Sequence, residues 1–488
     1  MSPVLTRALV ATLSALVGAC TLEPAYHRPV SPALPIEDIS KDGVSAADVG
    51  WREFFVDPQL QQLIALALVS NRDLRVAALS VREAQAQYRI QRADLFPTIN
   101  ASGAEQIEEL PAGVIGAPGP GGTTAATGTN ESTLRFYNVG IGFTSYELDL
   151  FGRIQSLNHA ALEQYFSYIE TRRSVQLSLV AEVASAYLSV LTDQTLLDLT
   201  RDTLRNQDES YALTRRMFQA GTSSELALRQ AETTVDAARV NVAQYTRRIA
   251  QDRHALEFLL GSPIPANIAF SGGLDRGSLV ADIVEGVPSD VLVYRPDVLA
   301  AERQLRSANA QLGAARAAFF PAISLTGSFG TASTQLAGLF KGDSRTWTFS
   351  PQISVPIFAG GANYANLLAI RIARETAVAQ YEKAIQGAFR EVADALVARS
   401  TLDEQLQAQQ ALTDTSLRAY RLADMRFRGG VDSYLTALDA QRALYGAQQE
   451  LQNVRLMRLQ ALITLYKALG GGLLERSADK SPSVPPLT

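Results

Sequence analysis

The sequence contains very few residues of the kinds that hold metals, disulfides or catalytic protons. Its 488 residues include one cysteine, Cys20, and three histidines, His27, His159 and His254. A lone cysteine cannot form a disulfide within the chain. The histidines are scattered, no HExxH pattern occurs, and no glycine-rich loop is followed by Lys-Ser or Lys-Thr to cradle a phosphate. We therefore expect no enzyme activity, no metal and no cofactor.

Strong charge, aromatic residues and long apolar runs are also missing. The formal net charge is −5, which gives no electrostatic basis for binding nucleic acid. Aromatic residues make up 7% of the chain, as expected for helices that pack through Ala, Leu and Val. Beyond the N-terminus no stretch reaches ~18 consecutive apolar residues, so no transmembrane helix is predicted.

The N-terminus has the pattern of a targeting segment. Arg7 precedes a short apolar core from Ala8 to Val17, which predicts a signal peptide over residues 1–19. Cys20 follows Leu-Val-Gly-Ala, a pattern similar to the bacterial lipobox, in which the cysteine becomes the lipidated first residue of the mature chain. The alternative is an ordinary cleavage site with an incidental cysteine. Residues 20–50 are rich in Pro, Ala and Ser and predict an extended, lipid-anchored leader.

The stretch from Arg153 to Ala220 lacks both glycine and proline. One continuous helix of that length would reach roughly 100 Å. Its apolar residues recur every seventh position, which favours a left-handed supercoil with neighbouring helices. Gly221 ends this helix, and the stretch from Thr222 to Leu260 repeats the heptad pattern. The pattern predicts a long antiparallel helical hairpin with its tip at Gly221. On these residues alone, a soluble coiled-coil rod is the alternative.

The sequence contains an internal duplication. The segment from Asn71 to Pro97 matches that from Arg295 to Pro321, and the segment from Glu182 to Gly261 matches that from Glu391 to Gly470. Each repeat has the order short helix, two strands, long helix, medium helix. We expect the short and medium helices to stack end to end beside the long one. The predicted divisions are a signal peptide 1–19, a leader 20–50, a first repeat 51–261, a linker or equatorial segment 262–294, a second repeat 295–470 and a C-terminal tail 471–488.

The predicted elements follow from the same patterns. Asp57-Pro58 predicts a helix start, with Asp57 as the N-cap. Phe-Pro ends each short helix, because proline removes a helix donor. The helices of the two repeats are predicted at 72–95, 153–220, 222–260, 297–320, 361–428 and 431–469. The strands are predicted at about 98–106, 136–148, 322–331 and 347–358.

The four predicted strands alternate apolar and small polar residues. From Ile323 to Phe329, for example, apolar residues interleave with Ser and Thr. The strands have the length that a tilted barrel strand needs to cross a membrane. Four strands cannot close a barrel, and an open edge in lipid leaves backbone groups unpaired at several kcal/mol each. A membrane location therefore requires an oligomer that closes one barrel jointly; a soluble antiparallel sheet is the alternative.

These residues carry a resemblance to a known family. WREFFVDPQLQQLI from Trp51, YRIQRADLFP from Tyr88, YELDLFGR from Tyr146 and GGVDSYLTALDAQR from Gly429 are similar to the TolC-type outer-membrane factors. The chain most resembles the OprM branch of lipoprotein efflux channels (NodT family). The resemblance implies an α+β membrane protein, in which a homotrimer forms a 12-stranded barrel and an α-helical periplasmic tunnel. It also implies a lipid anchor in the outer membrane of a Gram-negative bacterium. A periplasmic membrane fusion (adaptor) protein, an inner-membrane resistance-nodulation-division transporter and outer-membrane lipid are the implied partners.

The resemblance also assigns a gate to one tip of the tunnel. Leu435, Asp439 and Arg442 lie on one face of a helix that follows the turn at Gly429 and Gly430, as Gly221 marks the other tip. In a trimer this face would give a Leu ring that blocks water, an Asp439 ring that binds cations weakly, and an arginine that latches the closed state. The alternative is an ordinary exposed ion pair between Asp439 and Arg442.

The expected function is a passive exit duct of a tripartite efflux pump, which carries drugs and other small toxic compounds from periplasm to exterior. A channel for type I protein secretion is the first alternative. A structural periplasmic coiled-coil lipoprotein is the second, although it does not explain strands placed identically in both repeats.

Overall fold

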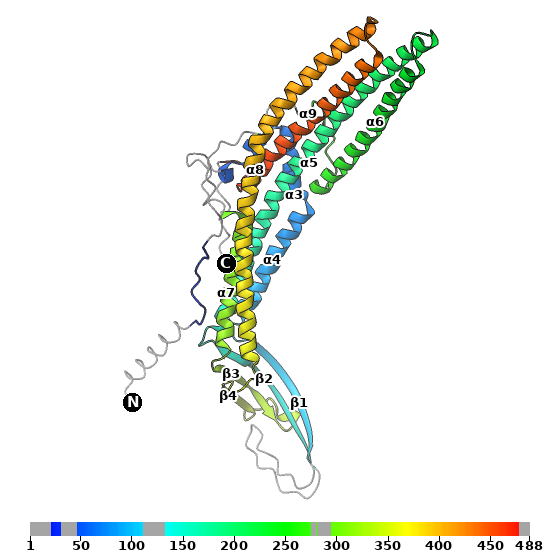
Figure 1. The fold of residues 1–488 in the computed structure, drawn as a ribbon. Helices are drawn as coiled ribbons and strands as arrows, with labels where there is room; N and C mark the ends of the chain where they lie inside the picture. The colour runs from blue at the N-terminus through cyan, green and yellow to red at the C-terminus, as the bar shows by residue number, and fades with distance from the viewer. Residues whose placement is uncertain (1–20, 31–45, 111–131, 275–279, 281–293, 478–488) are drawn as a thin grey trace. The chain divides into compact units, whose positions relative to one another are not determined.

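The computed structural model describes residues 21–30, 46–110, 132–274, 280 and 294–477, which are mostly helical with one small sheet (Figure 1). The predicted signal peptide and Cys20 lie outside the described residues, as do parts of the predicted leader, linker and tail. The chain divides into two compact units. Unit 1 comprises Met1–Arg28, Glu83–Phe166 and Arg303–Ala379, and unit 2 comprises Pro29–Arg82, Ser167–Glu302 and Gln380–Thr488.

Unit 1 contains a single antiparallel sheet in the order β1-β2-β3-β4. Two strands come from each predicted repeat, so the sheet joins the repeats. A β-bulge interrupts the register between Phe143 and Tyr146, where Ser145 has a φ of 55°. The bounds are Ile99–Leu110 for β1, Ser132–Leu148 for β2, Ala322–Ser333 for β3 and Arg345–Ser354 for β4. β4 is shorter than predicted, and Pro356, which has no N–H for a ladder hydrogen bond, follows its end.

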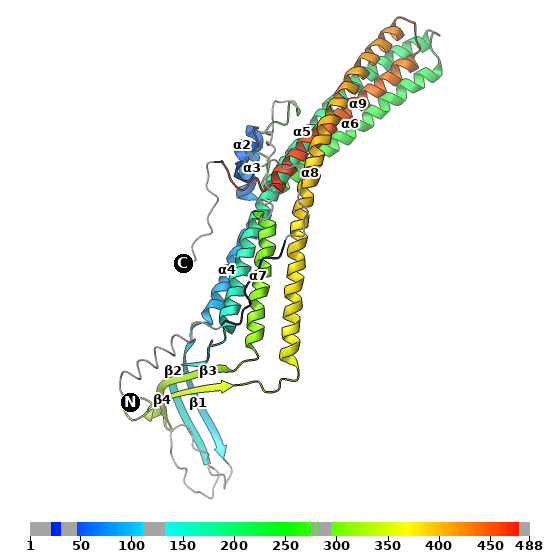
Figure 2. The ribbon, with the colours of Figure 1, turned by 60° about the vertical axis from the view of Figure 1, so that its left-hand side comes forward.

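Each strand of this sheet is joined to a helix (Figure 2). α4 and α7 lead into β1 and β3, whereas α5 and α8 follow β2 and β4. In unit 1, α5 and α7 lie side by side. The Ser307 hydroxyl on α7 donates a 2.9 Å hydrogen bond to the Ala160 carbonyl on α5. The bounds are Arg72–Ala93 for α4, Arg153–Gln219 for α5, Pro296–Ala317 for α7 and Ala362–Arg428 for α8. Both short helices end before the Phe-Pro pairs, as the loss of a helix donor at proline requires.

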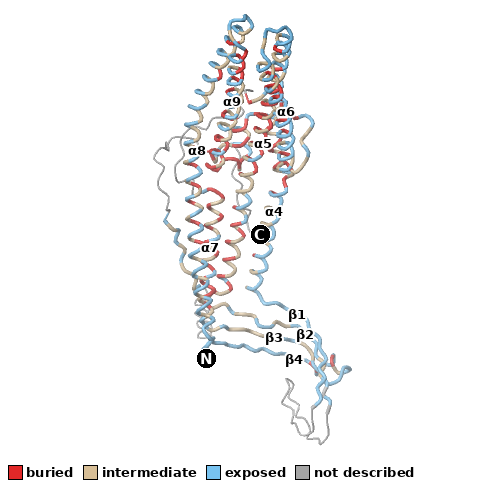
Figure 3. The backbone as a smooth tube through the Cα atoms, turned by 45° about the vertical axis from the view of Figure 1, so that its right-hand side comes forward, coloured by how far each residue is buried: buried red, intermediate tan, exposed pale blue. Residues whose placement is uncertain are grey.

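Unit 2 is built on an apolar core near its shorter helices, α2 (Trp51–Phe54) and α3 (Pro58–Ser70). Asp57 caps α3 by accepting a 2.8 Å hydrogen bond from the Gln59 N–H. The ring of Phe54 stacks on Tyr466 with centroids 3.9 Å apart. Figure 3 shows that buried residues concentrate here and along the facing sides of the long helices.

The short and medium helices meet end to end in unit 2, by the same contact in both repeats. α6 (Glu225–Leu260) ends where Asn71, the residue before α4, donates a 2.8 Å hydrogen bond to the Leu259 carbonyl. α9 (Tyr434–Ala468) ends where Arg295 donates a 2.9 Å hydrogen bond to the Ala468 carbonyl. Each side chain therefore satisfies a carbonyl that the helix end leaves unpaired. The end-to-end stacking expected from the sequence is confirmed at these two joints.

The helix starts of α6 and α9 lie a few residues after the predicted positions 222 and 431. Ser224 caps α6 by accepting a 3.2 Å hydrogen bond from the Ala227 N–H, and Ser433 precedes α9. The compact units also cut across the predicted repeats 51–261 and 295–470, because corresponding parts of the two repeats pack on each other. Among the described helices, α5 alone contains a window apolar enough to cross a bilayer, and 56% of that window is buried within the protein.

Candidate functional site

One face of the sheet in unit 1 is exposed and mostly apolar, with the charged Glu105 and Arg135 on it towards the far ends of β1 and β2. Residues directly opposite each other in neighbouring strands share a face, so the register defines rows across the sheet. One row runs from Ala101 through Ile141 and Phe329 to Trp347. Trp347 is 74% exposed and Phe329 is 59% exposed, which is unusual for large apolar side chains on neighbouring strands. The same face carries further exposed apolar residues: Ile99, Ile107, Val139, Phe349 and Ile353.

The opposite face of the sheet is small and polar. The adjacent row runs from Asn100 through Gly142 and Ser328 to Thr348. The hydroxyl groups of Ser328 and Thr348 are 2.7 Å apart and form a hydrogen bond. The sheet therefore separates an apolar surface from a polar one across a single layer, which is the pattern of a barrel wall between lipid and water.

Both outer edges of the sheet are open. Within the described part of the chain, β1 and β4 each pair with one strand only. The helices next to these strands carry exposed apolar side chains: Ile90 on α4 is 70% exposed, and Tyr364, Leu368 and Ile372 form an exposed stripe on α8. Unpaired edges beside apolar side chains are a template for a further strand and helix.

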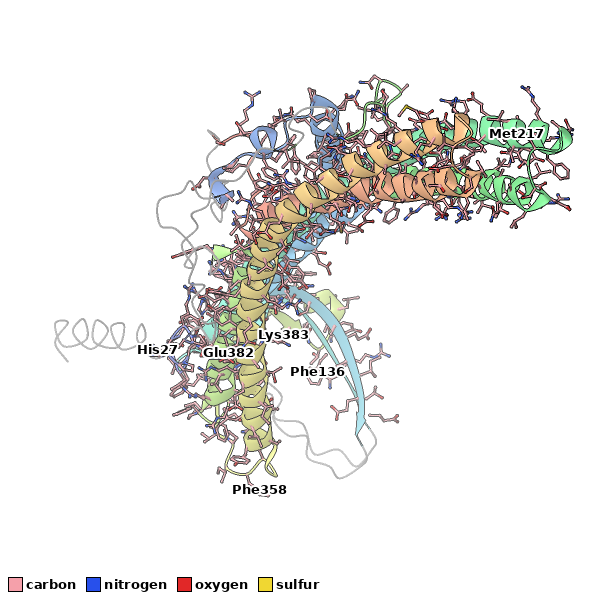
Figure 4. All side chains as sticks on the ribbon, turned by 45° about the horizontal axis from the view of Figure 1, so that its top comes forward. His27, Phe136, Met217, Phe358, Glu382 and Lys383 are labelled. Carbon is pink, nitrogen blue, oxygen red and sulfur yellow. The ribbon has the colours of Figure 1, made fainter. Side chains whose placement is uncertain are left out.

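The two helical hairpins of unit 2 end in tips with the same backbone geometry. Gly221 and Gly430 both have positive φ, 75° and 72°. At the first tip the Thr222 N–H donates to the Met217 carbonyl at 2.9 Å. At the second tip the Val431 N–H donates to the Arg426 carbonyl at 2.9 Å. Both tips are Schellman turns, in which a left-handed glycine closes the helix end. Figure 4 labels Met217 at the first tip.

The two glycines predicted for the second tip have different backbone conformations. Gly430 adopts the left-handed conformation, but Gly429 still donates a helical hydrogen bond to the Met425 carbonyl at 2.9 Å. The counterpart of Gly429 in the first tip is Ala220, which makes the same bond to the Arg216 carbonyl. One glycine per tip therefore makes the turn, and Gly429 lies at the end of α8.

The predicted gate residues lie together on the exposed side of α9. Leu435 is 46% exposed, and the Asp439 and Arg442 side chains are 66% and 51% exposed. Their charged groups are 4.0 Å apart, at the limit of an ion pair. The opposite side of α9 is buried and includes Tyr434, Ala437, Leu438, Gln441 and Leu444. In one chain, therefore, the three gate residues contact no core and are available to other copies or to solvent.

A closer ion pair at the second tip was not predicted from the sequence. Arg426 donates to both carboxylate oxygens of Asp432, with distances of 2.5 and 3.0 Å. The hydrogen bond from Arg426 lowers the pKa of Asp432. The signal in the sequence is weak, because side chains six positions apart lie on different sides of a continuous helix and meet here only because the helix ends between them. The counterparts in the first tip are Met217 and Ser223, which cannot form such a pair.

The two hairpins pack on each other within unit 2. Near the tips, Tyr434 and Leu438 of α9 are buried against Ala231 of α6. Further along, the Tyr445 hydroxyl lies 2.8 Å from the Thr200 hydroxyl of α5. The Gln449 amide donates to the Tyr245 hydroxyl of α6 at 2.9 Å. These contacts fix which side of α9 stays exposed. Among the described residues, no cluster of three or more His, Cys, Asp or Glu side chains could hold a metal ion.

Comparison with known proteins identifies the family. The profile of the family described as "Outer membrane efflux protein" matches residues 63–262 and 287–471, which include most of the described helices and strands. The chain belongs to this family. The resemblance expected from the sequence is thereby confirmed.

Relatives of this efflux protein include two from Pseudomonas. The probable efflux pump outer membrane protein TtgC of Pseudomonas putida is 47% identical over 484 residues, which cover 97% of this chain and 98% of the relative. The outer membrane protein OprJ of Pseudomonas aeruginosa is 42% identical over 462 residues, which cover 93% of this chain and 94% of OprJ.

Solved structures of similar chains share the fold. A membrane protein from Pseudomonas aeruginosa superimposes with a TM-score of 0.85 at 42% identity, covering 92% of this chain and 100% of the other. The open state of the MtrE outer membrane channel of Neisseria gonorrhoeae gives a TM-score of 0.82 at 37% identity, covering 94% of this chain and 100% of that one. This efflux protein is therefore an outer-membrane channel whose fold is mostly helical with a small sheet.

Proposed function

We propose that three copies of this efflux protein close one 12-stranded barrel in the outer membrane and form one helical tunnel in the periplasm. The observation that carries the proposal is the four-stranded sheet, with one exposed apolar face and two open edges. A head-to-tail contact between β4 of one copy and β1 of the next pairs every strand and closes a ring. It also brings the apolar stripe on α8 towards Ile90 on α4 of the neighbour.

In this assembly the channel is a passive duct within a tripartite pump. Relatives are named as parts of efflux pumps for antibiotics and for toluene, which supports small toxic compounds as cargo rather than secreted protein. A duct needs a pump that selects the cargo and an adaptor that joins the two. We therefore infer a resistance-nodulation-division transporter and a periplasmic adaptor as partners.

The gate belongs to the same proposal. Three copies of the exposed α9 face would place three Leu435, three Asp439 and three Arg442 side chains around the three-fold axis. Crowded carboxylates repel each other, so a cation must hold the ring closed, and Arg442 is the nearest one on α9. The alternative remains an exposed pair that contributes a few tenths of a kcal/mol.

Two neighbouring residues test the membrane face. Phe349 and Ser350 are adjacent on β4 and point to opposite faces of the sheet. Phe349→Lys places a charge in lipid at a cost of about 2–4 kcal/mol near the midplane, whereas Ser350→Lys places it in water. We expect Phe349→Lys to abolish assembly in outer membranes and Ser350→Lys to preserve it. Equal tolerance of both variants would favour a soluble sheet and overturn the proposal.

Native mass spectrometry of the wild-type protein in detergent measures the number of copies directly. A folded monomer at high dilution is incompatible with the shared barrel. Drug susceptibility of a deletion strain, with and without the gene restored, measures efflux. If the deletion leaves susceptibility to a broad panel of compounds unchanged, the result favours the alternative function, a channel for type I protein secretion.

The lipid anchor is proposed on the sequence pattern at Cys20. Several acyl chains together anchor a protein stably, at ~0.8 kcal/mol per buried CH₂. Radioactive fatty acid should label the wild type but not Cys20→Ala, and equal labelling of both would end the claim. Because the proposed barrel by itself holds the protein in the membrane, the Cys20→Ala variant should keep much of its efflux activity.

A further inference from the structure

The loop between β3 and β4, residues 334–344, has a defined shape that its own hydrogen bonds maintain. It contains one turn of 3₁₀ helix, η3 (Leu336–Gly338). The Ser344 hydroxyl lies 2.6 Å from the Leu339 carbonyl and 2.7 Å from the Lys341 carbonyl, so this buried side chain closes the loop from inside. The directions of the other side chains of the loop are therefore set by this internal bonding.

The same loop exposes two large apolar side chains. Leu336 is 65% exposed and Phe340 is 78% exposed, whereas Leu339 between them is only 3% exposed. The loop thus buries one apolar side chain and leaves two others of similar or greater size at its surface. Exposed apolar side chains that gather on one part of a protein mark a site of contact with an apolar partner.

The apolar face of the sheet runs towards this loop. On that face Phe329 lies opposite Trp347, and the next row towards the loop pairs Thr331 with Arg345. Arg345 is the first residue of β4, so the loop lies directly beyond this row. Because α7 precedes β3 and α8 follows β4, the loop is at the end of the sheet away from these helices (Figure 2). The exposed apolar side chains of the loop therefore follow the outer end of the apolar face.

Two basic side chains occur where the apolar face meets the loop. Lys341 and Arg345 are exposed, and neither forms an ion pair with another residue that the structure describes. Asp343 is the one acidic residue from Thr334 to Arg345, so this segment carries a net charge of +1. Basic residues beside exposed apolar side chains bind anionic lipid, because their stems lie along the apolar surface while their charged ends reach the headgroup.

In the barrel proposed above, the length of the apolar face places these basic residues at a membrane boundary. The innermost row of that face pairs Ile323 with Ile353, and Thr331 lies eight positions further along β3. At about 3.4 Å per residue and a tilt of roughly 40°, this distance corresponds to about 20 Å across the membrane. The apolar band of a barrel is about 25 Å tall. Arg345, opposite Thr331, therefore lies near the outer edge of the hydrocarbon layer, where headgroup phosphates lie.

We propose that residues 334–345 form a binding site for anionic lipid in the outer leaflet, an inference that rests on the barrel proposed above. Leu336 and Phe340 insert between acyl chains, and Lys341 and Arg345 bind the phosphate of the headgroup. The charge of the segment favours this occupant over a second copy of the same loop, because two segments of net positive charge repel each other. The site anchors the outer ends of β3 and β4 to the membrane.

Quenching of tryptophan fluorescence by brominated lipid tests whether the loop lies in the membrane. The full-length protein is placed in nanodiscs of phosphatidylcholine that is brominated near the headgroup. Trp347 reports on the sheet, and Phe340→Trp in a Trp347→Phe background reports on the loop. Trp51, the other tryptophan, is buried in unit 2 and contributes a constant background, which Trp347→Phe alone measures. We expect the two reporters to be quenched to a similar extent.

The headgroup preference is measured at Trp347 in nanodiscs of unlabelled phosphatidylcholine that contain a small fraction of brominated lipid. The ratio of quenching by brominated phosphatidic acid to quenching by brominated phosphatidylcholine gives the preference. Because the segment carries one net positive charge, the wild type should prefer phosphatidic acid about fivefold. The double variant Lys341→Gln/Arg345→Gln should lose this preference.

Arg135→Gln is the matched control, because it removes an exposed arginine from the same face of the sheet. Arg135 lies opposite Ile107, and Glu105 and Glu109 lie two positions to either side of Ile107 on β1. Carboxylates at these diagonal positions are within reach of a long side chain and offset its charge. Arg135→Gln should therefore keep the preference for phosphatidic acid.

The outcomes separate the lipid site from the barrel. Quenching of Phe340→Trp, together with a preference for phosphatidic acid that the double variant loses, supports the site. A quenched Trp347 beside an unquenched Phe340→Trp shows that the loop lies in water or on protein, and it overturns the site while leaving the barrel. A wild type without preference, or a double variant that keeps it, also overturns the site. If Trp347 itself escapes quenching, the sheet does not face lipid, and both the barrel and the site are wrong.

Discussion

The two hairpin tips of unit 2 share the same backbone conformation but differ in the charge of their side chains. Gly221 and Gly430 close equivalent Schellman turns with φ values within a few degrees of each other. The first tip is neutral where the second is charged: Met217, Ser223 and Gln230 stand where the second tip has Arg426, Asp432 and Asp439. Duplication therefore preserved the turn, which the backbone requires, and left the side chains free to diverge. The charged tip is the one that carries the proposed gate.

The largest difference between the tips should appear in conductance. Arg442→Ala removes the cation nearest to Asp439 and should raise the resting open time in a planar bilayer about fivefold or more, the effect of losing roughly 1 kcal/mol of coupling. Asp439→Ala should reduce cation preference. Thr233→Ala and Gln230→Ala are the matched controls in the first tip and should change neither quantity. If both second-tip variants conduct like the wild type with trimers intact, Asp439 and Arg442 are a surface pair.

Substitution of the turn glycine should reduce stability by the same amount in both tips. Nothing lies within 4 Å of a Cβ atom added at Gly221 or Gly430, so alanine brings no clash at either position. The remaining cost is the left-handed backbone, about 1–2 kcal/mol per residue. We expect Gly221→Ala and Gly430→Ala to lower the thermal unfolding midpoint by similar amounts, measured by circular dichroism. A large difference between them would mean that contacts with another copy of the chain hold one tip.

Only the first hairpin should respond to mild acid. Burial raises the pKa of Asp193 on α5 to about 6, with Arg248 opposing and Asp252 adding to the shift. The folded state therefore binds a proton more tightly than the unfolded state, whose aspartate titrates near pH 4. The stabilising effect of that proton is complete below about pH 4 and is lost as the pH rises through 6, in total about 1–2 kcal/mol.

Asp193→Asn should remove this pH dependence, measured by hydrogen exchange of the first hairpin at pH 5 and pH 7. The second hairpin has Leu402 and Ala461 at the positions of Asp193 and Asp252, so its exchange provides the internal control. A first hairpin that is more protected at pH 7 than at pH 5, after correction for intrinsic exchange rates, would contradict the prediction.

The smallest effect should come from the pair between Arg426 and Asp432. The Arg426 side chain is 57% exposed and the Asp432 side chain is 27% exposed, and pairs that solvent reaches contribute little to global stability. Arg426→Ala should leave the unfolding midpoint unchanged but speed amide exchange in the turn that follows Gly430. Met217→Ala, at the same place in the first tip, should not alter exchange there. Unchanged exchange in Arg426→Ala would show that the Schellman hydrogen bonds suffice.

Much of this protein is determined by short-range patterns in the sequence. The absence of Gly and Pro across Arg153–Ala220 is enough for a long helix, and a single glycine is enough to end it. The alternation of apolar and polar residues from Ile323 to Phe329 defines a strand with two unlike faces. Such patterns can be interpreted because each depends on residues only a few positions apart. The repeated segments then show that both halves of the chain contain the same elements.

Contacts between distant segments were decided by the tertiary structure alone. The segment from Thr21 to Tyr26 contacts α5 and α7 across more than a hundred residues of chain, and no local pattern in Glu23 or His159 predicts their pairing. Arg295 reaches the Ala468 carbonyl only because two helices end at the same point. Arg426 reaches Asp432 only because Gly430 is left-handed. The periodicity of one segment specifies which side is buried, but the partner depends on register, turns and close approach, which exist only once the chain has folded.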